Sequence, residues 1–239
     1  MLFYENGKSE SVFVVRFVVT ENQFLSVYYE QKAGHQLDIN SFVYINFNIP
    51  AVDLINQIEQ FYIINNKPDT LKHVRSVAGT NIDIAKQFDL DVNKCYLAGL
   101  LHDIGIVMKP EDMIHYAKDI GMDIDESENK YPFLLHQRIS KNIAEQIFRN
   151  EDTDILSAIE CHTTLKANPG KYDMSLFIAD KLSWNQEGKP PFYNQVKSAL
   201  AQSLESACLQ YMTYMLENDM ILYPHRQFVE ARIFLENQI

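Results

Sequence analysis

Six side chains able to bind a metal ion are spread over more than one hundred positions of this chain. Each lies within, or at the end of, a segment with helical periodicity. They are His73, His102, Asp103, His136, His162 and Asp180. Imidazole and carboxylate groups together suit Zn, Mn and Fe. If the six act together, the chain must fold so that several helices meet at one point.

The helical pattern begins near residue 50, where apolar residues start to recur at helical spacing. Gly and Pro number eight each, a low count that favours long helices. The pattern predicts an all-α body with a single core over residues 50–239. The expected helices span 51–64, 71–88, 92–102, 110–119, 133–149, 153–162, 173–183, 192–217 and 225–237.

The first 49 residues have a different pattern, rich in Val, Phe and Tyr. Strand-like runs occupy 12–19, 24–29 and 42–48. In the last run, Val43, Ile45 and Phe47 alternate with polar residues, which is typical of a strand. We therefore expect a small β-rich N-terminal extension over residues 1–49, with strands that could pair across a homodimer.

Charge and cysteine content limit the classes of function. The formal net charge is −11, which argues against nucleic acid as a partner because phosphate backbones require basic surface. A small phosphorylated ligand is compatible with this charge, because metal ions supply positive charge locally. The three cysteines form no C-x-x-C motif, and the apolar run 12–19 is too short to cross a bilayer. We expect a cytoplasmic protein with no membrane contact.

The adjacent pair His102-Asp103 ends the apolar run AGLLHDIG (98–105). Neighbouring residues on a helix point about 100° apart, so both can face one point only at a helix end. Gly105 is consistent with such an end. From there Asp103, with two oxygens, could bridge two ions while His102 binds one.

A single histidine in a helix is usually an ordinary surface or core residue. We assign that role to His35, His115 and His225. A histidine-rich core without metal is the alternative for the whole set. It would require a separate buried partner for each imidazole.

The order His73, His102-Asp103, Asp180 resembles the H…HD…D pattern of the HD-domain metal-dependent phosphohydrolases. His136 and His162 match the two histidines of its two-metal members. Within that superfamily the chain is most similar to the YqeK branch, the symmetrical diadenosine tetraphosphate hydrolases, over about residues 55–200. The further matching stretches are AGLLHDIG (98–105), LLH (134–136), CHTT (161–164) and MSLFIADKL (174–182).

The resemblance implies an HD-domain helical bundle that holds two divalent ions, with Fe first and Mn, Zn, Mg or Ni as alternatives. His73, His102, Asp103 and Asp180 would hold one ion. Asp103, His136 and His162 would hold the other. Such a centre would clamp a phosphate and activate a water molecule, and Asp103 is the leading catalytic candidate.

The chain departs from the branch where a polyphosphate would bind. The first Lys after the pair is Lys109, Gln137-Arg138 stands in place of a Gly after His136, and Leu165-Lys166 stands in place of Gly-Arg. An Arg expected shortly after Asp180 is also missing. The metal ligands are intact, which supports the reaction type and leaves the substrate open.

Several residues are candidates for contact with the substrate. Lys181 follows Asp180 directly and is a second catalytic candidate; the others are Lys109, Arg138, Thr163, Thr164 and Lys166. For each cation the alternative is a solvated surface charge. For the threonines it is a helix cap. Trp184 and Tyr193 could stack on a nucleobase, although a packing role suits the single Trp better.

Two functions remain open. The first is a phosphohydrolase acting on a nucleotide or a related small phosphorylated compound, possibly a dinucleoside polyphosphate. The second is a nucleotide-binding regulatory module that keeps the scaffold with little turnover. The changed cationic positions favour the second, and the six intact ligands favour the first.

Overall fold

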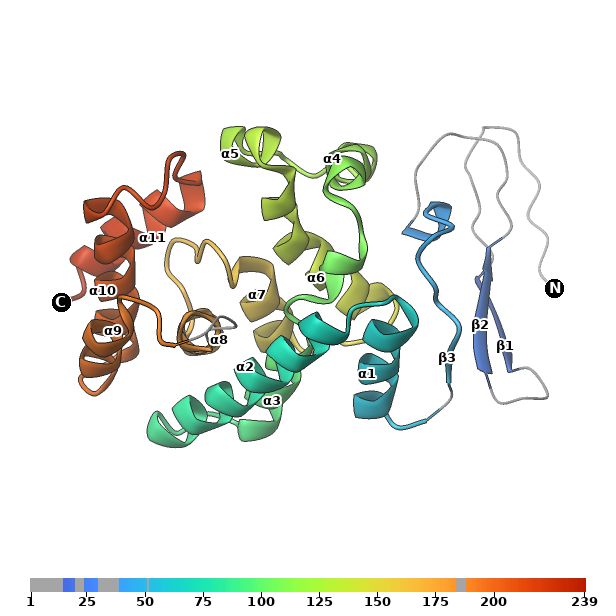
Figure 1. Cartoon of the computed structure of the whole chain (residues 1–239), viewed down its shortest axis with the longest axis horizontal. Coiled ribbons are helices and arrows are strands. Elements are labelled where there is room, and N and C mark those ends of the chain that lie inside the picture. Colours follow the sequence, from blue (N-terminus) through green and yellow to red (C-terminus); the bar gives the residue numbers. More distant parts are fainter. Residues whose placement is uncertain (1–14, 20–23, 30–38, 51, 184–187) are drawn as a thin grey trace.

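The computed structural model describes residues 15–19, 24–29, 39–50, 52–183 and 188–239 (Figure 1). Three strands, β1 (Val15–Val19), β2 (Phe24–Tyr29) and β3 (Ile49–Pro50), form an antiparallel sheet in the order β1-β2-β3. The body is helical: α1 (Leu54–Ile64), α2 (Pro68–Gln87), α3 (Val92–Leu101), α4 (Pro110–Asp119), α5 (Glu126–Lys130), α6 (His136–Gln146), α7 (Thr153–Cys161), α8 (Lys171–Leu182), α9 (Tyr193–Leu200), α10 (Leu204–Glu217) and α11 (Arg226–Glu236). The short 3₁₀ helices are η1 (Ile39–Ser41), η2 (Ile104–Val107) and η3 (Pro132–Leu135).

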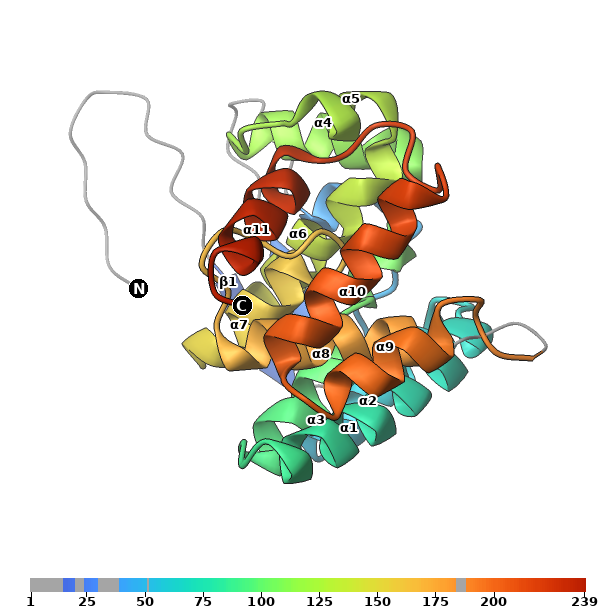
Figure 2. The same ribbon diagram turned by 90° about the vertical axis from the view of Figure 1, so that its left-hand side faces the viewer.

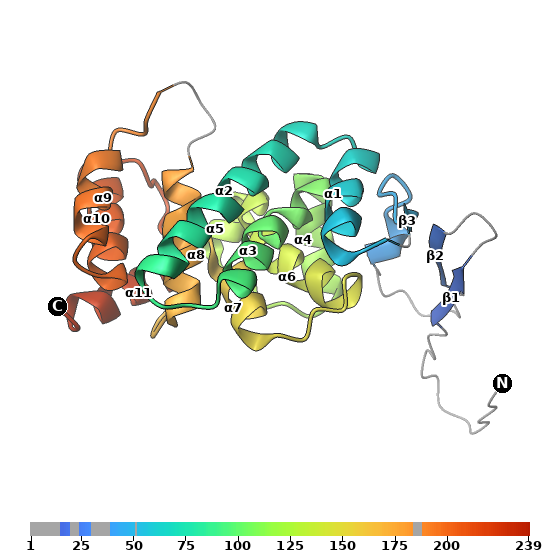
Figure 3. The same ribbon diagram turned by 90° about the horizontal axis from the view of Figure 1, so that it is seen from below.

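The described elements are spread along the long axis of the molecule (Figure 1). The sheet lies at one end, and α9, α10 and α11 lie at the other (Figures 1 and 3). Between them, α2 packs on α3 and α8, while α7 contacts α3, α6 and α8. Helix α10 crosses α8 on the side seen in Figure 2. The expectation of an all-α body is confirmed.

The contact between α2 and α3 is unusually close because α3 carries Gly99. A Cβ on Gly99 would lie only 2.5 Å from the Cα of Ala78. Val74, Val77 and Ala78 form the buried face of α2 at this contact. Small residues on both helices therefore let the two backbones approach closely. This close contact brings His73 on α2 near His102 at the end of α3.

The helices α3 and α7, which both lead to candidate ligands, begin and end in the same way. Asp91 caps α3 by accepting from the backbone N–H groups of Asn93 and Lys94. Asp152 caps α7 in the same way, accepting from Asp154 and Ile155. Side-chain caps of this kind stabilise a helix start by about 1 kcal/mol. Each of the two helices then ends at a histidine in the C-cap position, His102 in α3 and His162 in α7.

The strand expected at 42–48 is wrong. The chain there turns twice, with Ile45 N–H donating to Phe42 O and Ile49 N–H to Phe47 O. Phe42, Ile45 and Ile49 are buried, whereas Val43 is 95% exposed. The burial therefore follows a spacing of three to four residues, and the alternation at Val43, Ile45 and Phe47 had no partner strand to match.

Two expected helices are each divided. The segment 133–149 begins as η3 and becomes α helix only at His136, ending at Gln146. The expected helix 192–217 is broken at residues 201–203, because Ser203 caps a new helix by accepting from Ser206 N–H. Two helices that fold back on each other, α9 and α10, replace one long helix.

Within the described part of the chain, no helix combines the length and the apolar character needed to cross a membrane.

Candidate metal centre

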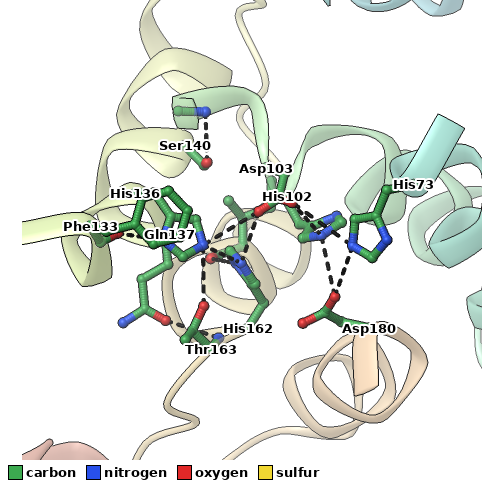
Figure 4. Close-up of polar contacts among 12 residues, drawn as sticks. His73, His102, Asp103, Phe133, His136, Gln137, Ser140, His162, Thr163 and Asp180 are labelled. Carbon is green, nitrogen blue, oxygen red and sulfur yellow. Dashed lines mark hydrogen bonds and ion pairs between the residues drawn. The ribbon is translucent and has the colours of Figure 1, made fainter. Parts of the chain in front are cut away.

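The six side chains singled out from the sequence meet at one point between α2, α3, α6, α7 and α8 (Figure 4). Asp103 lies at the middle of the group, just past the end of α3. The expectation that the His102-Asp103 pair stands at a helix end is confirmed. Gly105 then lets the chain pack against α6: a Cβ there would lie 2.6 Å from the carbonyl oxygen of His136.

One side of the group consists of His73, His102 and Asp180 around one oxygen of Asp103. His73 Nε2 lies 3.1 Å from Asp180 Oδ1 and 3.9 Å from Asp103 Oδ2. His102 Nε2 lies 3.4 Å from Asp103 Oδ2 and 3.7 Å from Asp180 Oδ1. Two nitrogens and two carboxylate oxygens thus face a common space.

The other oxygen of Asp103 faces two further histidines. His136 Nε2 and His162 Nε2 each lie 3.4 Å from Asp103 Oδ1. The same two nitrogens lie 3.0 Å from each other. Asp103 therefore presents one oxygen to each half of the group.

Three of the four imidazoles are held in one orientation by the same local contact. The Nδ1 atom of His102 lies 2.8 Å from the Gly99 carbonyl oxygen, that of His136 lies 2.6 Å from Phe133 O, and that of His162 lies 2.9 Å from Ile159 O. Each carbonyl belongs to the residue three positions earlier. An Nδ1–H that donates to a carbonyl leaves Nε2 as the free ligand atom, as in most metal-binding histidines.

The donor set fits divalent cations. With the Nδ1 protons on carbonyls, the Nε2 lone pairs of His136 and His162 face each other at 3.0 Å, a repulsive contact that a cation or a proton would relieve. Among the described residues, His102 Nε2 and His73 Nδ1 are buried without a hydrogen-bond partner. Such orphaned atoms are rare in folded proteins. The subsets His73–His102–Asp180 and His102–Asp103–His162 each offer three ligand atoms within 4.8 Å of one another.

The electrostatics of the group keep its carboxylates ionised. Burial alone would raise the pKa of Asp103, but the neighbouring imidazoles, His102 foremost, hold it well below its usual value. Burial likewise opposes ionisation of Asp180, yet Lys181 and His73 hold its pKa below the ordinary range. Burial lowers the pKa of His162 to about 4. Burial would also lower the pKa of His102, but Asp103 raises it to about 9.

Lys181 supports the group from outside. Its Nζ lies 2.6 Å from Asp180 Oδ2 and 3.2 Å from the carbonyl oxygen of His162. The outer oxygen of Asp180 is thereby fixed, and the inner oxygen Oδ1 points to His73. The Lys181 side chain is only 13% exposed.

Thr163 borders the group directly, with its hydroxyl 3.3 Å from His136 Nε2. Thr164 is buried and donates its hydroxyl to the Leu165 carbonyl. Gln137, which the sequence marks only as a departure from the branch after His136, holds this turn: its Oε1 accepts from the backbone N–H groups of Thr163 at 3.0 Å and Thr164 at 3.3 Å. No local sequence signal predicts this role of Gln137, because its partners come from a distant segment.

The three remaining candidate cations are engaged with other groups. Lys109 lies over the ring of Tyr44, with Nζ 4.6 Å from its centroid. Arg138 donates to Asp123 O at 2.6 Å and to Glu128 at 3.2 Å. Lys166 pairs with Asp173 at 3.0 Å. The structure does not bring these three into the ligand group.

The other histidines and aromatic residues have separate places. His115 is exposed, and His225 caps α11 by accepting from Gln227 N–H. His35 and Trp184 lie outside the described residues. Tyr193 carries Lys189 over its ring, with Nζ 4.4 Å from the centroid.

Comparisons with known proteins agree with this geometry. A family model described as HD domain matches residues 70–185, a span that contains all six ligand candidates. A protein of Lactococcus lactis subsp. cremoris, described as an uncharacterized protein in the pepC 5' region, is 39% identical over 147 residues. That match covers 62% of this chain and 75% of the relative.

Two further relatives extend the comparison. A symmetrical bis(5'-nucleosyl)-tetraphosphatase of Halalkalibacterium halodurans is 26% identical over 175 residues, which is 70% of this chain and 90% of that protein. A crystal structure from Clostridium acetobutylicum, described as a predicted HD superfamily hydrolase involved in NAD metabolism, has a TM-score of 0.70. It is 24% identical and covers 77% of this chain and 97% of its own. The chain belongs to the HD-domain family.

Proposed function

We propose that the protein is a divalent-metal-dependent phosphohydrolase that cleaves a phosphate anhydride in a nucleotide, with dinucleoside polyphosphates as its substrate class. The observation that carries this proposal is the position of Asp103: one oxygen lies 3.4 Å from His102 Nε2 and 3.9 Å from His73 Nε2, and the other lies 3.4 Å from the Nε2 atoms of both His136 and His162. The similarity to a symmetrical bis(5'-nucleosyl)-tetraphosphatase supports the substrate class.

Two ions are proposed, with iron first and Mn, Zn, Mg or Ni as alternatives. His73, His102, Asp103 and Asp180 would hold one, and Asp103, His136 and His162 the other. Divalent ions held there would polarise a phosphoryl oxygen and lower the pKa of water towards neutrality.

The chain's own residues would then orient the substrate. The Thr163 hydroxyl, 3.3 Å from His136 Nε2, would donate to a phosphate oxygen. Lys181 holds Asp180 with one oxygen turned inward and adds positive charge near the phosphate. Attack of water on phosphorus forms one P–O bond and breaks the anhydride P–O bond. In central cleavage of diadenosine tetraphosphate the leaving group is one ADP, the water oxygen stays on the other ADP, and the protons of the water pass to the products and the solvent.

The test is elemental analysis of the purified protein, followed by incubation with diadenosine tetraphosphate and separation of the products by ion-exchange chromatography. Cleavage at the central anhydride releases ADP as the sole product, and a chelator should stop its release. Release of ATP with AMP would contradict symmetrical cleavage. Metal-loaded protein that hydrolyses neither this compound, nor a panel of nucleotides, nor p-nitrophenyl phosphate would contradict the hydrolase assignment.

A second function has one observation in its favour. Lys109, Arg138 and Lys166 are each engaged with another part of the chain, so a polyphosphate would have to compete for these three candidate cations. A regulatory module that binds a nucleotide with little turnover fits that feature. Tight nucleotide binding by metal-loaded protein without release of product would support this function over the first.

A further inference from the structure

Beside the candidate metal centre lies an aromatic ring that the chemistry proposed above does not use. Phe133 is 44% exposed, although most of the large apolar side chains around the centre are buried. Its ring stacks on the imidazole of His136, with centroids 4.7 Å apart and planes inclined by 23°. One face of the ring is thus covered by a ligand candidate, and the side chain stays accessible next to the centre.

The position of this ring is fixed from both sides. Pro132 starts η3, which restricts the backbone before Phe133. The Phe133 carbonyl accepts from His136 Nδ1 at 2.6 Å. An aromatic platform that is already ordered loses little conformational freedom when a ligand stacks on it.

The turn before Phe133 adds a second exposed aromatic group. Tyr131 and Tyr223 are each 42% exposed, and their ring centroids lie 6.2 Å apart. Lys130 places its ammonium group 3.3 Å from the centroid of the Tyr223 ring. Exposed aromatic surface therefore continues along the chain from Tyr131 to Phe133.

Distance decides which ligand suits Phe133. His136 Nε2 is 3.4 Å from Asp103 Oδ1, so the ring that covers His136 lies one side chain away from the place where phosphate would bind. A nucleotide with its phosphate at Asp103 carries a sugar and a flat aromatic base over a short reach. Nucleobases stack on aromatic side chains without a need for specific hydrogen bonds.

We propose that Phe133 is the stacking platform of a nucleobase subsite and that the base it takes is a purine, which offers the larger ring surface. The inference rests on the proposed function, because it places the phosphate at the metal centre. It assigns substrate selection to a residue in η3 that is separate from the metal ligands. The ring, not a charged side chain, then distinguishes nucleotides from other phosphate compounds.

The experiment compares two ligands that resist hydrolysis, adenosine 5'-methylenediphosphonate and methylenediphosphonate, by calorimetry with metal-loaded protein. Both carry a P–C–P bridge that water does not cleave, and only the first carries a base and a sugar, joined through an ester to one of the two phosphonates. We expect the first to bind about tenfold more tightly in the unaltered protein, a difference of about 1.4 kcal/mol. In Phe133→Leu, which keeps apolar volume and lacks the ring, this ratio should fall below about threefold.

Ile63→Ala serves as the matched control, because Ile63 is similarly exposed (49%) and lies on α1, away from the ligand group. Its ratio should equal that of the unaltered protein. Phe133→Trp is the second variant, and its added indole should be quenched by the adenosine compound and not by methylenediphosphonate. Trp184, the only native Trp, gives the background signal in the unaltered protein.

An unchanged ratio in Phe133→Leu would overturn the proposal, as would a Phe133→Trp fluorescence that does not respond to the adenosine compound. A changed oligomeric state with an unchanged ratio would identify Phe133 as a subunit contact instead. Hydrolysis is scored separately, by ADP release from diadenosine tetraphosphate. If the unaltered protein releases ADP and the binding ratio is unchanged in Phe133→Leu, the base subsite alone is rejected. If the ratio falls in Phe133→Leu and the unaltered protein releases no ADP, the hydrolase alone is rejected.

Discussion

The Nε2 atoms of His136 and His162 lie 3.0 Å apart, while the Nδ1 atom of each ring lies within 2.9 Å of a backbone carbonyl oxygen. Two ring nitrogens that both point lone pairs at each other are stable only with a cation or a proton between them. The low pKa of His162, about 4 because of burial, disfavours the proton at neutral pH. A metal ion bound at this group would relieve the contact between the two lone pairs.

Removal of metal should lower the stability of the protein. A ligand present at a hundred times its dissociation constant stabilises the folded state by about 2.7 kcal/mol. For a chain of this size, that corresponds to a fall in Tm of roughly 5–10 °C on chelation. Calorimetry with and without chelator measures the shift, and restoring Mn²⁺ should reverse it. An equal Tm in both conditions would contradict a metal site that forms part of the folded core.

Asp103→Asn should remove both metal binding and hydrolysis. The amide keeps the shape of the side chain but loses the charge that faces both halves of the site. We expect metal content to fall below one ion per chain and ADP release to fall by at least about 10³-fold. Asp83→Asn, a change at an exposed carboxylate (80% exposed), is the control. Full metal content and activity in Asp103→Asn would contradict the bridging role.

Lys181→Met should lower turnover without abolishing it. The substitution removes the ammonium group 2.6 Å from Asp180 Oδ2, so the carboxylate can rotate and its pKa rises. Loss of such an outer partner typically costs 10–100-fold in metal affinity or activity, and we expect a fall in that range, measured as kcat for ADP release. Lys189→Met, at an exposed lysine, should behave as the unaltered protein. Equal kcat values in both variants would show that Lys181 has no part in the site.

The stability of the metal-free protein should depend on pH with a maximum near 6.5. The folded pKa of His102, about 9, lies above its ordinary 6.5, so its stabilisation is complete below pH 6.5 and is lost towards pH 9. The folded pKa of His162, about 4, lies below 6.5, so its stabilisation is lost as the pH falls from 6.5 to 4. Each shift corresponds to about 3 kcal/mol.

Bound metal should remove the loss of stability that the metal-free protein shows above pH 6.5. Because an ion displaces the His102 proton, its binding strengthens as the pH rises. The difference in the free energy of unfolding between metal-loaded and chelated protein should therefore grow from pH 6.5 to 9. Urea titrations at several pH values measure it. A difference that shrinks over this range would mean that His102 is not a ligand.

Substitution of Gly99 in α3 and of Gly79 in α2 by Ala should have opposite effects on the stability of the protein. Gly99→Ala places a Cβ 2.5 Å from the Cα of Ala78, which forces α2 and α3 apart; we expect destabilisation of about 2–3 kcal/mol and loss of metal, because His73 and His102 separate. Gly79→Ala, one residue from Ala78, meets nothing within 4 Å and should stabilise the helix by roughly 0.5–1 kcal/mol. Thermal melts of the two variants, with metal analysis of each, test the pair.

The sequence was informative where local chemistry determines structure. Helical spacing predicted the ligand-bearing helices, and Gly105 with the His102-Asp103 pair predicted the helix end between α3 and η2. The prediction of a strand at 42–48 was wrong because alternation alone cannot say whether a partner strand exists. The break before Ser203 was not predicted because the apolar pattern continues across it, and only the cap hydrogen bond to Ser206 starts a new helix.

Within the site, residue types that bind metal could be recognised one by one, but their supporting contacts could not. Gln137 and Thr163 are 26 positions apart in the sequence, so no local pattern predicts their contact. Lys109, Arg138 and Lys166 looked like free cations because the partners of all three depend on the tertiary fold. A charged side chain becomes available to a ligand only if the fold leaves it without a closer partner.

Three of the proposed ligand histidines have their rings locked by a carbonyl three residues earlier. Rings held in this way cannot follow ions of different radius, so adjustment to the size of a cation would fall to the other proposed ligands. Lys181 restrains Asp180, whereas the Nδ1 atom of His73 has no hydrogen-bond partner among the described residues. Discrimination between iron, manganese and zinc in the cell is thus expected to depend on how far His73 can turn and Asp103 can tilt.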